Sequence, residues 1–99
     1  MTTYDQDTSM LIAYIDARYF EPQSKWEDYW LRMRSYELWA TDDILKSIYD
    51  HPFVDPREII RGFIDRMELW LDIINDNTDQ TYMFSVAKET AEDLLKFLK

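Results

Sequence analysis

The stretch DPREIIRGFIDRMELWLDII, residues 55–74, carries the clearest helix signal in the chain and decides its fold class. Asp55 can cap the first turn, and Pro56 is favourable at the first helical position. Glu58 lies near the positive end of the helix dipole, where an acid is stabilising. One face then collects apolar residues at helical spacing. They are Ile59, Ile60, Phe63, Ile64, Met67, Trp70, Leu71 and Ile74. The stretch predicts a helix over residues 56–74 with a broad core face.

Outward from this helix, the same periodicity predicts three more helices, over about residues 9–20, 24–49 and 81–98. Pro22 and Pro52 stand between apolar-periodic stretches, where helix breakers belong. Consecutive helices joined by short connections favour antiparallel neighbours. We therefore expect one all-α domain over residues 1–99, either a four-helix bundle or a closely related orthogonal packing.

Local signals predict where these helices begin. Thr8 or Ser9 is the expected N-cap of the first helix, and the run from Ser24 to Glu27 is a capping box for the second. The turn-forming cluster at residues 75–79 precedes the last helix.

The second predicted helix leaves two questions open. A capping hydroxyl at Thr41 is followed by two aspartates, so a kink or restart near residue 41 is the alternative to one continuous helix. If the helix is continuous, Glu37 falls within its apolar stripe and needs a cation or hydrogen-bond donors, or else it becomes protonated.

Charge and composition exclude several classes of function. Twenty acidic residues against eleven basic ones give a net charge of −9, which disfavours binding to nucleic acid or to anionic membranes. The chain has no cysteine, no signal-peptide pattern and no apolar run long enough for a membrane span. The expected setting is a soluble protein of the cytoplasm whose partner presents a neutral or basic surface.

Helix 56–74 carries the first candidate binding surface. Asp65, Glu68, Asp72 and Asp76 form one line of like charges, which we call the acidic stripe. Like charges at this spacing destabilise a helix slightly, and acids near its C-terminus oppose the helix dipole. We interpret the stripe either as a solvated face relieved by nearby arginines (Arg32, Arg34, Arg61 and Arg66) or as a docking surface for a basic protein.

Beside the acidic stripe, Gly62, Arg66, Leu69 and Ile73 form a second line, which we call the flank. It widens the apolar arc beyond an ordinary stripe and favours either a central helix covered on two sides or a self-association surface. Gly62 suggests close approach by another helix, because glycine inside a helix is otherwise unfavourable. In the second helix, Leu31 and Leu38 belong to a line of leucines at seven-residue intervals and are the other candidates for self-association.

No catalytic, cofactor-binding or metal-binding set is predicted. His51 is the sole histidine and is expected to be a loop or capping residue, and one glycine cannot make a phosphate-binding loop. The pairs Asp65 with Glu68 and Glu89 with Glu92 have the spacing that all-α nucleotide pyrophosphatases use to hold Mg²⁺. A Mg²⁺-dependent enzyme of this class is therefore an alternative to a role without catalysis.

In size, acidity and helical character the chain resembles the small bacterial immunity proteins that block nuclease toxins, although it carries no motif diagnostic of that family. The leading hypothesis is a small acidic helical interaction module of bacterial or phage-like character. It would act as an antagonist or adaptor on a basic protein surface, without catalysis. A homodimeric structural protein is the alternative.

Overall fold

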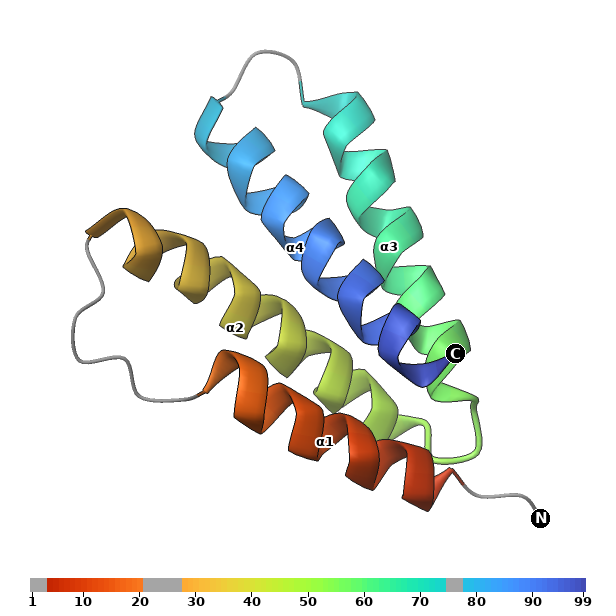
Figure 1. The fold of residues 1–99 in the computed structure, drawn as a ribbon. Helices are drawn as coiled ribbons and strands as arrows, with labels where there is room; N and C mark the ends of the chain where they lie inside the picture. Colours follow the sequence, from red (N-terminus) through yellow and green to blue (C-terminus); the bar gives the residue numbers. More distant parts are fainter. Residues whose placement is uncertain (1–3, 21–27, 75–77) are drawn as a thin grey trace.

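The computed structural model describes residues 4–20, 28–74 and 78–99, together with the side chains of all of these except 28–31 and 78. Within them the chain forms four helices and no strand (Figure 1). The helices are α1 (Asp5–Tyr19), α2 (Asp28–Asp50), α3 (Pro56–Ile73) and α4 (Thr78–Leu98). The predicted all-α four-helix bundle is confirmed.

Helix α4 is the central element of this bundle. It runs between α2 and α3 in Figure 1 and packs against α1, α2 and α3, whereas α3 packs mainly on α4 and touches α2. Ala87 and Ala91 are fully buried on α4, and such small side chains allow several neighbours to approach. The expectation that helix 56–74 is central and covered on two sides is therefore wrong.

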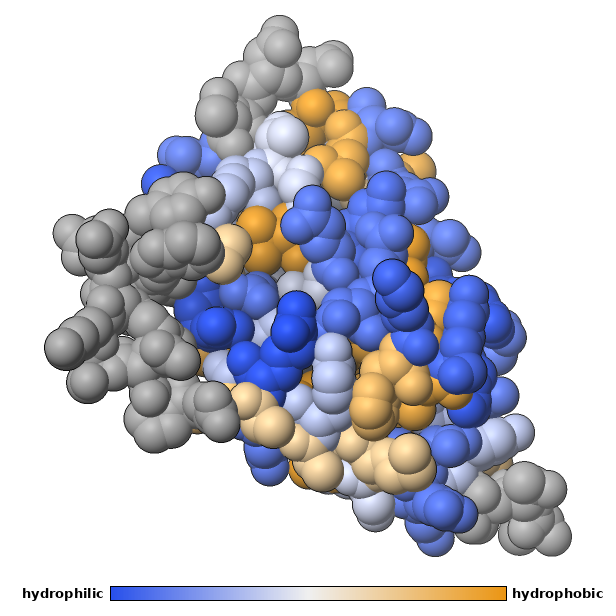
Figure 2. Space-filling model, viewed as in Figure 1, coloured by the Kyte–Doolittle hydropathy of each residue, from blue (hydrophilic) through white to orange (hydrophobic). Residues whose placement is uncertain are grey.

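The core gathers one face from each helix. Its members are Leu11, Ile15, Tyr19, Ala40, Ile44, Ile48, Ile60, Phe63, Met67, Ala87, Ala91, Leu94 and Leu98. The spacings of three and four residues within each helix are those of a single buried stripe. Much of the face seen in Figure 2 is hydrophilic, with apolar patches between the polar side chains.

The start of α3 is confirmed in atomic detail. A carboxylate oxygen of Asp55 accepts a hydrogen bond from the backbone N–H of Arg57 at 3.0 Å, and Pro56 occupies the first helical position. The capping box at Ser24 to Glu27 lies outside the described residues.

Two helices begin earlier than predicted. Helix α1 starts at Asp5, so the expected N-cap at Thr8 or Ser9 is wrong, and Tyr4 at the cap position makes no side-chain cap. Asp5 and Asp7 instead place acids in the first turn, where the helix dipole favours them. Helix α4 starts at Thr78 rather than near residue 81.

Helix α2 continues through Thr41 without a restart. The Thr41 side chain is fully buried, and its hydroxyl donates to the backbone carbonyl of Leu38 at 2.9 Å. The hydroxyl is thus satisfied within the preceding turn and does not cap a new helix.

Arg57 ties three helices together at one end of the bundle. Its Nη1 lies 3.0 Å from Asp7 Oδ2 on α1 and 3.2 Å from Asp55 Oδ1 at the start of α3. Its Nε donates to the carbonyl of Leu98, in the last turn of α4, at 3.1 Å. A guanidinium can make these bonds at once because its donors lie in one planar fork.

We expect Arg57→Met to lower the free energy of unfolding by about 1–2 kcal/mol, because several partly buried charged hydrogen bonds are lost together. Urea denaturation measures this change. Arg61→Met is the matched control, since among the described residues Arg61 pairs only with exposed Glu58, and it should change stability by less than about 0.5 kcal/mol. Equal effects from the two variants would contradict the role given to Arg57.

Candidate functional site

The flank of α3 is an exposed surface that is apolar except for Arg66. Leu69 and Ile73 are 58% and 59% exposed. A Cβ placed on Gly62 would have no side chain or other non-local atom within 4 Å, so the expected close approach of another helix at Gly62 does not occur within the described chain. The flank is uncovered because α3 packs mainly against α4 and buries a different face, which carries Ile60, Phe63 and Met67.

The acidic stripe lies next to this flank. Asp65, Glu68 and Asp72 are exposed, and Asp76 lies outside the described residues. Glu68 Oε1 is 3.5 Å from Lys88 Nζ on α4. Asp65 and Asp72 form no ion pair within the part of the chain that the structure describes.

The arginines expected to relieve the stripe bind other acids. Arg61, Arg66, Arg32 and Arg34 pair respectively with Glu58, Asp43, Asp79 and Glu37. The stripe thus keeps most of its negative charge available to the outside. The structure therefore does not show the expected relief of the acidic stripe by these four arginines.

The flank and the stripe form one continuous surface. At 100° per residue, Leu69 and Ile73 lie between Trp70 on one side and Asp65 with Asp72 on the other. Going around α3, the surface passes from Trp70 past Arg66 to the aliphatic residues and then to the acids.

An aromatic cleft opens between α2, α3 and α4 on the Trp70 side of the flank. It has a volume of about 370 Å³ and is lined by Trp39, Asp43, Arg66, Met67, Trp70 and Phe84. Trp70 stacks on Phe84, with 6.1 Å between ring centroids and 9° between planes, and Trp39 lies 6.0 Å from Phe63. The two tryptophan residues nevertheless stay 42% (Trp39) and 45% (Trp70) exposed.

The remaining self-association candidates lie on α2. Leu38 is partly buried and packs against the core of its own bundle. The side chain of Leu31 is outside the described residues. Of the five candidates, Gly62, Leu69 and Ile73 are thus the ones that share an exposed face.

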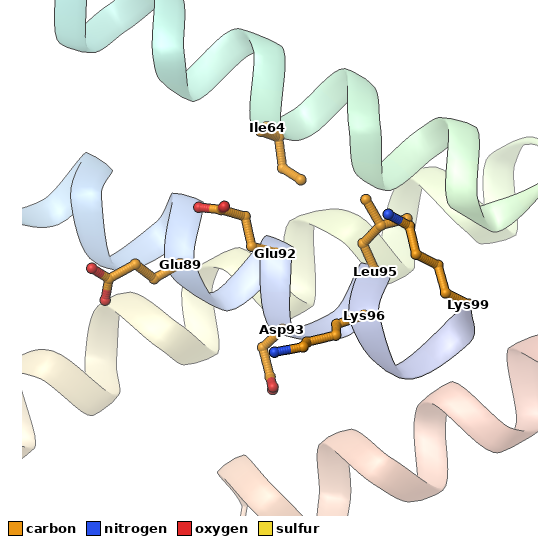
Figure 3. Close-up of a pocket in the computed structure, with 7 residues that line it drawn as sticks. All are labelled: Ile64, Glu89, Glu92, Asp93, Leu95, Lys96 and Lys99. Carbon is orange, nitrogen blue, oxygen red and sulfur yellow. The ribbon is translucent and has the colours of Figure 1, made fainter.

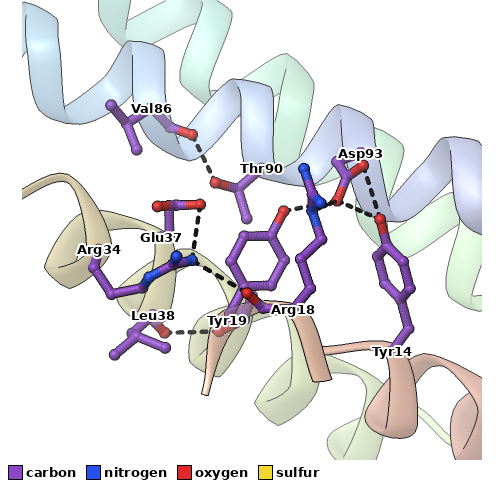
Figure 4. A network of polar contacts seen from close by, with 10 residues as sticks. Tyr14, Arg18, Tyr19, Arg34, Glu37, Leu38, Val86, Thr90 and Asp93 are labelled. Carbon is purple, nitrogen blue, oxygen red and sulfur yellow. Dashed lines mark hydrogen bonds and ion pairs between the residues drawn. The ribbon is translucent and has the colours of Figure 1, made fainter. Parts of the chain in front are cut away.

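A polar cluster joins α1 to α2 and α4, as Figure 4 shows. Asp93 accepts hydrogen bonds from the hydroxyls of Tyr14 at 2.8 Å and Tyr19 at 2.7 Å, and it forms an ion pair with Arg18 Nε at 3.0 Å. Burial raises the pKa of both tyrosines, and the bonds to the Asp93 carboxylate raise it further. This carboxylate is therefore a main polar attachment of α1.

Glu37 lies beside this cluster and behaves as its position in the apolar stripe predicted. Its side chain is 14% exposed, and Oε2 is 3.4 Å from Nη1 of Arg34. Oε1 is buried and has no hydrogen-bond partner among the described residues. Burial raises the pKa of Glu37, and the positive charges of Arg34 and Arg18 oppose that rise.

The outer face of α4 carries a mixed-charge groove (Figure 3). It has a volume of about 550 Å³ and is lined by Ile64, Glu89, Glu92, Asp93, Leu95, Lys96 and Lys99. Lysines stand among its carboxylates, and Glu68 of the other predicted pair is bound to Lys88. Within the described residues, no three acidic or histidine side chains are grouped to hold a metal ion.

His51 lies just after α2, as expected of a loop or capping residue. Its Nδ1 is 3.0 Å from the backbone carbonyl of Ser47, in the last turn of that helix. The histidine therefore caps a carbonyl at the C-terminal end of the helix.

Two features of these surfaces have no signal in the sequence. Asp93 falls on the polar side of its helix by periodicity, and only packing brings Tyr14 and Tyr19 of α1 to it. Trp70 lies on the core face of its helix by spacing and Trp39 lies on the polar side of its own, yet packing brings both, partly exposed, to one cleft.

Comparison with known proteins found no matching family model, no matching curated protein and no matching solved structure. None of the helices in residues 4–20, 28–74 and 78–99 is long and apolar enough to cross a membrane.

We expect the Asp93 cluster to make stability sensitive to alkaline pH. The pKa of Tyr19 is higher in the folded chain than the ordinary 10.0, so the unfolded chain loses this proton first as pH rises. The raised pKa of Tyr19 contributes fully to the free energy of unfolding below pH 10. This contribution is lost as pH rises toward the folded pKa, by up to about 1.4 kcal/mol per pH unit. Urea denaturation on both sides of pH 10 measures this loss.

Tyr19→Phe should reduce this alkaline loss. Exposed Tyr49 supplies the control, because Tyr49→Phe should leave the pH dependence as it is in the wild type. An unchanged alkaline profile in Tyr19→Phe would show that the Asp93 cluster does not couple α1 to pH.

Proposed function

We propose that this chain is a small acidic helical protein-interaction module that binds a basic protein surface through α3. It acts as an antagonist or adaptor by occupying that surface. The observation that carries the proposal is the exposure of Leu69 and Ile73 beside two carboxylates, Asp65 and Asp72, that form no ion pair within the described chain.

The two parts of this surface supply different contributions to binding. Covering an exposed aliphatic side chain such as Leu69 or Ile73 contributes up to about 1.5–3 kcal/mol each. Exposed carboxylates add less to affinity, but they attract a basic partner and set its orientation. The apolar strip of α3 bordered by acids is therefore complementary to an apolar strip on the partner that is bordered by Lys and Arg.

The proposed role is binding without catalysis, and the proposed location is the cytoplasm. Both are supported by the residues present: a cysteine-free sequence suits a reducing compartment, and the acids of α4 stand among lysines. The comparable size and acidity of immunity proteins motivates the antagonist form of the proposal.

The double variant Asp65→Asn with Asp72→Asn should lose partner binding and keep its fold. Removing like charges from one stripe should leave stability unchanged or slightly raised. The measurement is affinity capture from the native host at low and high salt, with quantitative mass spectrometry of the captured proteins and thermal unfolding of each variant.

A matched control removes the same charge elsewhere. Asp16 on α1 and Asp50 at the end of α2 are exposed, so Asp16→Asn with Asp50→Asn should capture the partner as the wild type does. If the two double variants capture equally well, binding depends on total charge and not on α3, and the proposal fails.

A homodimer is the second candidate, favoured by the same exposure of Leu69 and Ile73. A symmetric contact through the flank would bring the acidic stripes of two copies near each other. Such a contact opposes like charges, so it should form only where salt screens them.

Sedimentation equilibrium tests this second candidate. We expect a monomer at micromolar concentration in low salt, since the stripes then repel at full strength. A dimer that forms in low salt and is abolished by Leu69→Gln with Ile73→Gln would instead assign the flank to self-association.

A further inference from the structure

The aromatic cleft already holds a guanidinium from its own chain. Nη2 of Arg66 is 2.8 Å from Oδ2 of Asp43, and its Cζ lies 5.3 Å from the ring centroid of Phe63. One cation thus meets both a carboxylate and an aromatic face at the side of the cleft. These are the two groups that recognise arginine in proteins.

This internal ion pair is easily exchanged. The side chains of Arg66 and Asp43 are 51% and 38% exposed, and pairs this open to water contribute little to stability. Trp39 and Trp70 line the same cleft with part of their surface uncovered. Indole binds a cation more strongly than the phenyl ring of Phe63 does.

We propose that the aromatic cleft is the anchor site for an arginine side chain of the basic partner, which displaces Arg66 from Asp43 and stacks against Trp39 and Trp70. The inference rests on the proposed function and extends it, because the cleft continues the flank of α3. The volume of about 370 Å³ accommodates such a side chain with its neighbouring apolar groups.

The net charge of the chain and the acids beside the cleft favour a cationic occupant. The chain carries a net charge of −9, and the adjoining surface presents Asp65 and Asp72. An acidic segment would meet repulsion from both. Arginine suits the cleft better than lysine because its planar guanidinium can stack on indole while bonding a carboxylate.

The test uses three synthetic amphipathic helical peptides of equal length, with leucine on one face and arginine, lysine or glutamate on the other. Binding is followed by the indole N–H signals in ¹H–¹⁵N NMR spectra, assigned with Trp39→Phe and Trp70→Phe. The arginine peptide should shift the Trp39 and Trp70 signals and saturate. The lysine peptide should bind more weakly, and the glutamate peptide should leave both signals in place.

The two halves of the ion pair should respond in opposite directions. Asp43→Asn removes the negative charge that attracts the guanidinium and should weaken binding of the arginine peptide about three- to tenfold, whereas Arg66→Gln removes the internal competitor and should strengthen that binding about two- to fivefold. Simple disruption of structure would move both affinities the same way. Asp42→Asn is the matched control, because Asp42 is a neighbouring acid that pairs with Lys46 outside the cleft.

The outcomes separate this inference from the proposed function. Shifts confined to backbone amides around Asp65 and Asp72, with Trp39 and Trp70 unmoved, would overturn the anchor site and leave binding by α3 intact. Absence of any response at the two indoles likewise overturns it. The proposed function itself is decided by the capture experiment with the Asp65 and Asp72 variants.

Discussion

Small side chains on α4 set the arrangement of the whole bundle. Ala87 and Ala91 are fully buried, and Leu94 follows them on the same face, so three helices close around this one. Once α4 takes the central position, α3 lies at the edge and packs mainly on a single neighbour. An arc of α3 that is wider than one neighbour covers must then remain exposed.

The exposed arc of α3 is where the chemistry of the surface concentrates. Aliphatic residues of the flank separate an aromatic cleft from a line of carboxylates, and each of these parts favours a different portion of a basic amphipathic partner. Among the described acids of this line, Glu68 alone is paired, with Lys88, because the nearby arginines bind Glu58, Asp43 and Asp79 instead. Repulsion between its like charges lowers the stability of α3 slightly, and such a local cost is compatible with a binding role.

The attachment of α1 follows a different principle. Its buried apolar residues, Leu11, Ile15 and Tyr19, are few, and polar contacts to Asp93 and Arg57 supplement them at two positions along the helix. Such contacts depend on the protonation of their members, whereas apolar packing does not. The bundle therefore combines an apolar core with a first helix whose supplementary bonds to Asp93 need protonated tyrosine hydroxyls as donors.

The sequence by itself determined the fold class, the start of α3 at its Asp55 cap, the approximate extents of the helices and the need of Glu37 for a cation. Each follows from local rules of periodicity, capping and burial that act within a few residues. Tertiary structure alone decided that α4 is central, that Thr41 bonds backward to Leu38 and does not begin a helix, and that Asp93 receives two tyrosines. It also decided that Trp39 and Trp70 border an open cleft. Exposure at a helix crossing depends on how far each neighbouring helix extends, and periodicity within one helix carries no information about the length or position of its neighbours.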